Sequence, residues 1–94
     1  MSFTASLEGG KIRNACVFRS GNLNFFFYSN EGDPREPIHI HVRGSGANAK
    51  IWLEPTIGVA DSQGFNSKEL SAIIRLVIDN RVLIRQAWHE HFGD

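Results

Sequence analysis

The chain has 94 residues, of which 41% are hydrophobic and 11% aromatic, and its ten basic side chains balance its ten acidic ones. This length and composition exclude several domains and argue against disorder, because the chain is long enough to bury one apolar core. Zero formal net charge excludes a strong whole-molecule attraction to nucleic acid or to an anionic membrane, so any such binding requires a local patch.

The beginning of the chain and its single cysteine bear on the compartment. Residues 1–10 are small and polar and end in two glycines, so we expect a flexible lead-in before a single domain at residues 11–94. No signal peptide is evident, and no apolar run approaches the roughly 20 residues that a membrane helix needs. The lone Cys16 excludes an intrachain disulfide, and we expect its thiol to be buried and unreactive. The sequence therefore predicts a cytoplasmic protein without membrane contact.

Short apolar, aromatic or alternating segments separated by turn residues predict a sheet in the first two thirds of the chain. The longest loop in this part, Asn30–Pro37, is rich in charged and turn-forming residues, and such loops often carry function. We expect four or five mostly antiparallel strands, at about residues 15–19, 24–29, 38–43, 47–54 and 57–60.

The segment Ile38–Arg43 alternates strictly between apolar and polar residues. A period of two is typical of a strand with one buried and one exposed face, because successive side chains point to opposite sides. We expect the apolar side to face the core and the polar side to face solvent. The polar side consists of His39, His41 and Arg43.

A second alternating segment, residues 47–54, follows a Gly-Ser-Gly turn and should form a hairpin with the first. Matching apolar residues across this hairpin fixes the parity of the register, because a slip by one residue would turn the apolar side to solvent. The simplest match sets Ile40 opposite Ile51. The same register sets two pairs on the polar side: His41 with Lys50, and His39 with Trp52.

The last third of the chain predicts one long helix. Asn66 can cap its first turn, and Glu69 three residues later can reach back as in a capping box. Apolar residues then recur at helical spacing to about residue 90, over roughly 35 Å. Arg81 interrupts this apolar stripe, which leaves three alternatives: a bend near Asp79 and Asn80, an ion pair with a carboxylate, or a head group that extends past the core to solvent. The predicted fold class is α+β, a small sheet packed on one long C-terminal helix.

His39 and His41 are the most informative candidates for chemistry, because residues two apart on a strand share one face. Two neighbouring imidazoles suit a divalent transition metal or an acid/base pair near neutral pH. Glu36 and Glu54 are candidates for a third metal ligand, although neither has a diagnostic spacing. The alternative is that both histidines are half-exposed sheet residues without a ligand.

Other motifs give weaker signals. His89 and His91 are further metal candidates by residue type, but side chains two apart on a helix point about 200° away from each other and cannot chelate one ion. Near a helix C-terminus they are better explained by interaction with the helix dipole. The sequence contains neither a Gly-x-Ser-x-Gly nucleophile elbow nor a Gly-Lys-Ser/Thr phosphate loop.

The polar side of the predicted hairpin is the best candidate for a binding surface. Positive side chains beside an aromatic ring can hold a nucleic-acid strand through phosphate contacts and stacking. The same side chains would suit an acidic protein partner, and an ordinary solvated sheet face is the remaining alternative. The candidate binding residues are His39, His41, Arg43, Lys50 and Trp52.

Four motifs in order, at residues 25–32, 37–42, 49–55 and 88–92, resemble the family called domain of unknown function 4160, and the resemblance covers roughly residues 12–93. Two departures from the family pattern are a loop lengthened by Arg35 and Glu36 and a less acidic stretch at Val82 and Leu83. The residues that match the family's signature positions are His39, His41, Trp52, Glu54 and Trp88.

The resemblance implies a small bacterial protein of a family without an agreed activity. Genes of this family often lie beside the gene of another small protein, an arrangement suggestive of toxin–antitoxin pairs. We therefore expect an interaction module that binds a small protein partner through the polar sheet face, aided by the Asn30–Pro37 loop. The alternative is a nuclease-like hydrolase that uses His39 and His41 as acid and base, or as metal ligands with Glu36 or Glu54. A third alternative is a homodimer that pairs through the open sheet face.

Overall fold

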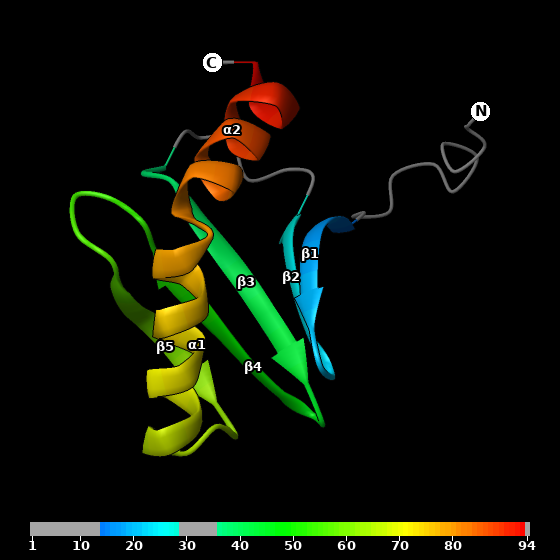
Figure 1. Ribbon diagram of the computed structural model, residues 1–94, viewed down its shortest axis with the longest axis vertical. Coiled ribbons are helices and arrows are strands. Elements are labelled where there is room, and N and C mark those ends of the chain that lie inside the picture. Colours follow the sequence, from blue (N-terminus) through cyan, green and yellow to red (C-terminus); the bar gives the residue numbers. More distant parts are fainter. Residues whose placement is uncertain (1–13, 29–35, 94) are drawn as a thin grey trace.

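A computed structural model describes residues 14–28 and 36–93 of the chain. These residues form a five-stranded antiparallel sheet followed by two helices, so the predicted α+β class is confirmed (Figure 1). The lead-in expected at residues 1–10 and most of the predicted loop, residues 30–35, lie outside the described residues. The strands are β1 (Asn14–Ser20), β2 (Leu23–Tyr28), β3 (His39–Gly44), β4 (Ala47–Trp52) and β5 (Gly58–Gln63), and the helices are α1 (Ser67–Asp79) and α2 (Arg81–Phe92).

The strands lie in the order β1-β2-β3-β4-β5, so each pairs with its neighbour in the sequence. The predicted register of the central hairpin is confirmed, because Ile40 pairs with Ile51. This register keeps the apolar residues of both strands on one side of the sheet. The two predicted polar pairs are also present: His39 with Trp52, and His41 with Lys50.

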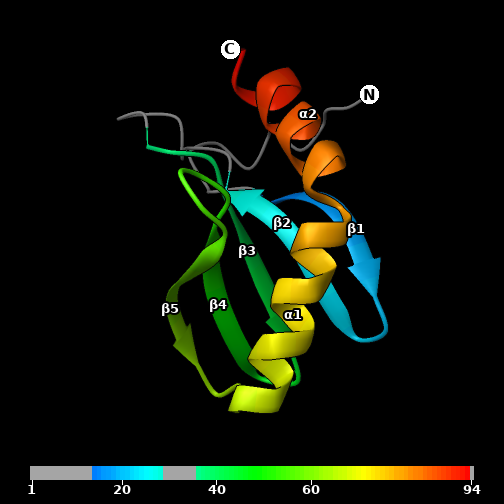
Figure 2. The same ribbon diagram turned by 60° about the vertical axis from the view of Figure 1, so that its left-hand side comes forward.

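Both helices lie on the same side of the sheet, as the two views in Figures 1 and 2 show. The core forms between this side and the helices, where Ile40 and Ile51 are fully buried together with Ile73, Val77 and Trp88. Burial of one such aliphatic or aromatic side chain contributes about 1.5–3 kcal/mol to folding. The opposite side of the sheet, which turns away from the helices, is called the open face below.

The prediction of one long helix is wrong, because the helical segment is interrupted at Asn80. The side-chain Nδ2 of Asn80 donates a hydrogen bond to the carbonyl oxygen of Leu76 at 2.8 Å, and its backbone N–H is also directed to the end of α1. Asparagine competes in this way with regular helical hydrogen bonds, which is why it favours helix ends. The break leaves Arg81 exposed, while Ile84 and Trp88 of α2 return to the core. Of the three alternatives for Arg81, the structure therefore shows the bend.

The predicted start of the helical segment is confirmed. Asn66 Oδ1 accepts a hydrogen bond from the backbone N–H of Glu69 at 2.8 Å, and Glu69 Oε1 accepts one from the backbone N–H of Asn66 at 2.8 Å. This reciprocal arrangement satisfies two donors that the first helical turn would otherwise leave unpaired.

Candidate binding face

The open face is built from cross-strand pairs that place polar and aromatic side chains in rows. One row crosses four strands, because Phe26 pairs with His41, His41 with Lys50, and Lys50 with Asp61. Side chains of paired residues lie on the same face and within contact distance of each other. With the alternate residues of β2, β3 and β4, the open face contains Phe26, Tyr28, His39, His41, Arg43, Asn48, Lys50, Trp52 and Asp61.

Arg43 covers an aromatic residue of the open face. Its guanidinium lies 5.0 Å from the ring centroid of Phe26, and its Nη2 donates to the hydroxyl oxygen of Tyr28 at 3.3 Å. The ring of His41 stacks on Phe26 at a centroid distance of 5.7 Å. Phe26 is therefore only 1% exposed although it lies on the side away from the helices. The surface at this point is therefore formed by Arg43 and His41, which cover Phe26.

A small hollow lies beside this cluster. Tyr28 and His41 meet edge to face at a centroid distance of 4.6 Å and form one wall. Polar and apolar residues of the neighbouring strands form the rest, with Val42 and Ala49 among them, and the hollow encloses about 230 Å³. Its polar and aromatic lining consists of Phe26, Tyr28, His41, Asn48, Lys50 and Asp61. Aromatic walls with a few convergent polar groups are typical of binding hollows, although this one is small.

His39 does not reach solvent, so the prediction that both imidazoles are exposed is wrong for this residue. Its side chain is 0% exposed. The ring meets Trp52 at a centroid distance of 5.4 Å and Trp88 at 5.2 Å. Its Nδ1 lies 2.9 Å from the carbonyl oxygen of Pro37, which can only accept, so Nδ1 carries the hydrogen. Trp88 belongs to α2 and reaches His39 at the first residue of β3, so His39, although alternation assigns it to the same side as His41, is closed off by a helix and forms no part of the accessible surface of the open face.

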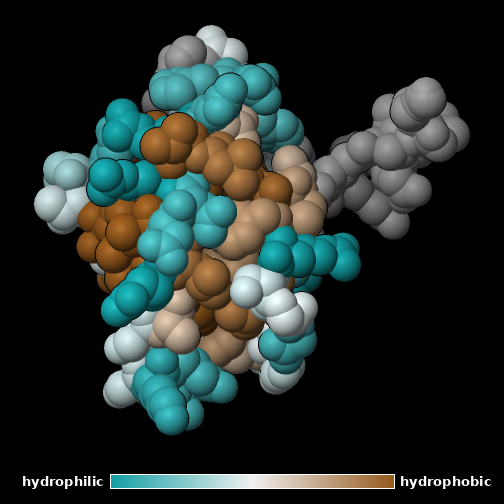
Figure 3. Space-filling view, in the orientation of Figure 1, coloured by the Kyte–Doolittle hydropathy of each residue, from teal (hydrophilic) through white to brown (hydrophobic). Residues whose placement is uncertain are grey.

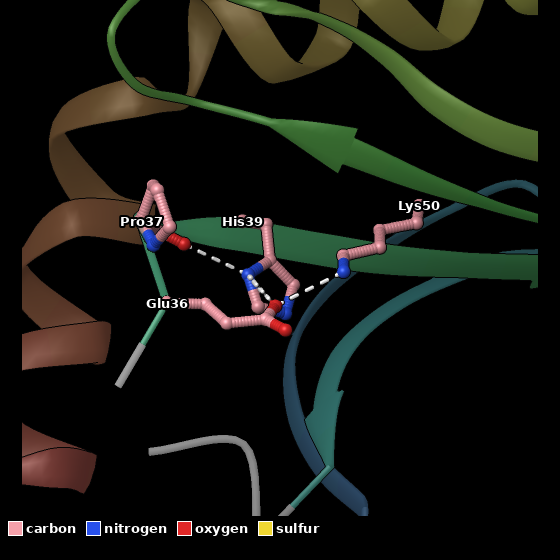
Figure 4. A network of polar contacts seen from close by, with 4 residues as sticks. All are labelled: Glu36, Pro37, His39 and Lys50. Atoms are coloured by element: carbon pink, nitrogen blue, oxygen red, sulfur yellow. Dashed lines mark hydrogen bonds and ion pairs between the residues drawn. The ribbon is translucent and has the colours of Figure 1, made fainter. Parts of the chain in front are cut away.

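A polar network extends from His39 to Lys50 (Figure 4). Glu36 Oε1 lies 3.0 Å from Lys50 Nζ and 3.7 Å from His39 Nδ1. The Lys50 ammonium also lies 4.5 Å from the ring centroid of Trp52. Lys50 is thus held between a carboxylate and an indole ring, which orders its long side chain over the open face.

The candidate metal ligands are only partly brought together. Glu36 and His39 lie close to each other, and the ring centroids of His39 and His41 are 5.3 Å apart. Glu54 pairs instead with Arg85 of α2, at 3.1 Å between Oε2 and Nη2. Within residues 14–28 and 36–93, no three His, Cys, Asp or Glu side chains are grouped as metal ligands would be. The ammonium of the lysine beside Glu36 also opposes the approach of a second cation.

Two features of the open face did not follow from the sequence. Cys16 is exposed, so the expectation of a buried thiol is wrong, and its Sγ lies 3.0 Å from Asn24 Oδ1. Cys16 pairs with Phe26 across β1 and β2, which places it on the open face at one end of the row. Asp61 was missed because β5 lacks an apolar alternation. Only its pairing with Lys50 in the structure places it on the open face.

The fold and this face define a small α+β domain in which an antiparallel sheet keeps one polar and aromatic side free of its helices. The family model Domain of unknown function (DUF4160) matches residues 22–89, and the chain belongs to this family. No curated protein and no solved structure matches the chain. In the described part of the chain, neither helix combines the length and the apolar character that crossing a membrane requires.

Proposed function

We propose that this protein is an interaction module of a toxin–antitoxin-like gene pair and binds a small protein partner through the open face. The observation that carries the proposal is that the helices cover only one side of the sheet, while half-buried aromatic rings and ordered cations lie on the other. Aromatic and arginine side chains are enriched at the energetic centres of protein interfaces. The contact residues are His41, Arg43, Lys50 and Trp52, together with Tyr28.

The partner surface should carry carboxylates. Arg43 and Lys50 are both held in place by aromatic neighbours, so little side-chain entropy is lost when they bind a carboxylate. The Lys50 ammonium already pairs with Glu36, so a carboxylate of the partner would share or replace this contact. The hollow beside Tyr28 and His41 can receive one side chain of the partner as an anchor. His39 does not contact the partner. It supports the binding residues by packing against Trp52 and by lying next to the Glu36 carboxylate.

A nuclease-like hydrolase has less support from the geometry. Acid/base catalysis requires the reacting nitrogen to come within about 2.6–3.2 Å of the substrate. His39 is fully buried, and its Nδ1 is already bonded to the carbonyl oxygen of Pro37. Only His41 of the pair is open on the surface. Metal analysis of the purified protein separates the two functions, because about one zinc or nickel ion per chain that is lost in His39→Asn would favour the hydrolase.

The test uses the protein encoded by the adjacent gene as the partner. The double variant His41→Ala, Lys50→Ala should no longer capture it in a pull-down and should show no heat of binding by calorimetry. The circular dichroism spectrum should stay unchanged, since both side chains are partly exposed. A matched control, Lys68→Ala with His89→Ala, removes the same residue types from exposed helix positions and should bind normally. Unchanged binding by the first variant would refute the proposal.

The same double variant also tests two other ligands of the open face, a nucleic acid and a second copy of this chain. Salt-dependent binding of a labelled single-stranded RNA, lost in the double variant, would replace the protein partner by nucleic acid. A dimer of the free protein that the double variant converts to a monomer would replace it by a second copy. Both results would contradict the protein-partner proposal while leaving the open face as the functional surface.

We further propose that this protein and its protein partner act in the bacterial cytoplasm. The exposed, unpaired thiol of Cys16 fits a reducing compartment, where such thiols persist. Fractionation of cells that express the tagged protein at its natural level would check this, and recovery in a secreted or periplasmic fraction would contradict it.

A further inference from the structure

A second surface lies on the helix side, between the edge strand β5 and helix α1. In the described part of the chain, β5 pairs only with β4, so the backbone groups along its other edge have no strand partner. A groove of about 440 Å³ runs between this strand and the helix. It is lined by Val59 of β5 and by Leu70, Ser71, Ile74, Arg75 and Ile78 of α1.

The groove exposes apolar side chains that a closed domain would cover. Val59 is 41% exposed and Ile78 is 43% exposed. Figure 3 shows hydrophobic surface on this side of the molecule, at the left where β5 and α1 lie in Figure 1. An apolar groove beside an unpaired strand edge is the arrangement that binds an added strand, because backbone hydrogen bonds hold the chain and alternate side chains enter the groove.

Arg75 favours a bound segment that carries a negative charge. It lies between Ser71 and Ile78 along α1, near the middle of the groove, and it is exposed. Within residues 14–28 and 36–93 its guanidinium forms no ion pair. A carboxylate in a bound segment would pair with it. Because Arg75 lies midway and not at one end, the carboxylate should come from an Asp or Glu side chain within the segment.

We propose that this groove binds an extended segment of a partner protein, which adds as a sixth strand to β5. Its residues alternate, so that apolar side chains face Val59 and Ile78 and an acidic side chain between them faces Arg75. The site is separate from the open face, on the other side of the sheet, and does not depend on the function proposed above.

A second copy of this chain fits the groove less well. If β5 of a copy were added, it would offer Val59 as its one large apolar residue. Its carboxylate, Asp61, pairs with Lys50 and therefore lies on the open face, away from Arg75. The β5 strand of a second copy would therefore supply neither the alternating apolar side chains that fit the groove nor a carboxylate that faces Arg75.

The probe is a seven-residue peptide, labelled with fluorescein at its N-terminus and amidated at its C-terminus, with Val, Glu and Val on one face and Thr at the other positions. Fluorescence anisotropy should show saturable binding. The Gln analogue of the peptide and the Arg75→Gln protein should each bind about two- to fivefold more weakly, as expected for an exposed ion pair. A peptide N-methylated at the amides that face β5 should not bind, because those amides form the ladder.

Matched variants distinguish this site from the rest of the surface. Arg81→Gln removes an exposed arginine of the next helix and should leave peptide binding unchanged. Ile78→Asp should abolish binding while the circular dichroism spectrum is retained, since Ile78 is part-exposed. The open-face variant His41→Ala, Lys50→Ala should bind the peptide normally, so failure of one proposal does not imply failure of the other.

Three results would overturn the proposal: no saturable binding, equal binding of the N-methylated peptide, or equal binding by Ile78→Asp. Sedimentation of the free protein adds a fourth. A dimer that Ile78→Asp converts to a monomer would show that a second copy occupies the groove.

Discussion

Removal of the His39 ring tests whether this residue belongs to the core or to the surface. The side chain is 0% exposed and its ring meets Trp52, Trp88 and His41 at centroid distances of 5.4, 5.2 and 5.3 Å. Truncation to alanine leaves a cavity the size of the imidazole, and large-to-small changes of this kind cost about 2–4 kcal/mol. His39→Ala should therefore lose a large part of the roughly 5–15 kcal/mol by which a small domain is stable.

Thermal unfolding followed by circular dichroism measures this loss. For a domain of this size the change corresponds to a melting temperature lower by about 10–25 °C. His39→Phe keeps the ring but loses the hydrogen bond to the Pro37 carbonyl, so its cost should be nearer to about 1 kcal/mol. His41→Ala is the matched control on the same strand, and because His41 is only half-buried, it should also cost about 1 kcal/mol.

Melting of His39→Ala within about 3 °C of the unchanged protein would refute the core position of His39, because no cavity would then have formed. The expected loss of stability also affects how activity measurements on His39→Ala are interpreted. Loss of an activity in His39→Ala would not by itself identify a catalytic residue, since the variant is expected to be partly unfolded. Tests of the hydrolase alternative should therefore rely on His41 and on the larger, polar replacements of His39.

Three further predictions concern single elements. Asn66→Ala removes the side-chain half of the capping box with Glu69 and should lower the free energy of unfolding by about 0.5–2 kcal/mol in urea denaturation, and an unchanged midpoint would contradict the cap. Gly44→Ala would place a Cβ 2.8 Å from Leu23 Cδ2 and 2.9 Å from the backbone oxygen of Asn22, so the variant should melt at a lower temperature, and equal stability would show that the turn has room. Cys16 is exposed, so one thiol per native chain should react promptly with Ellman's reagent, whereas reaction only after denaturation would place it in the core.

The local patterns of the sequence were sufficient for the sheet register and for the start of α1. Strict alternation at Ile38–Arg43 and at residues 47–54 restricts the pairing to registers that keep both apolar sides together, and the simplest of these, with Ile40 opposite Ile51, is the one that the structure has. The cap at Asn66 depends on residues within one turn, and these are adjacent in the chain. Such features involve neighbours in sequence or along one hairpin, so a single sequence contains the information that specifies them.

The tertiary structure decided which of these side chains are accessible. His39 and His41 share a strand face, yet only His39 is closed off, because Trp88 arrives from the C-terminal helix after the break at Asn80. The groove beside Arg75 exists because α1 packs next to the unpaired edge of β5. Burial depends on residues distant in sequence that meet only when helices pack on the sheet, and the period of a strand specifies a side but not what covers it.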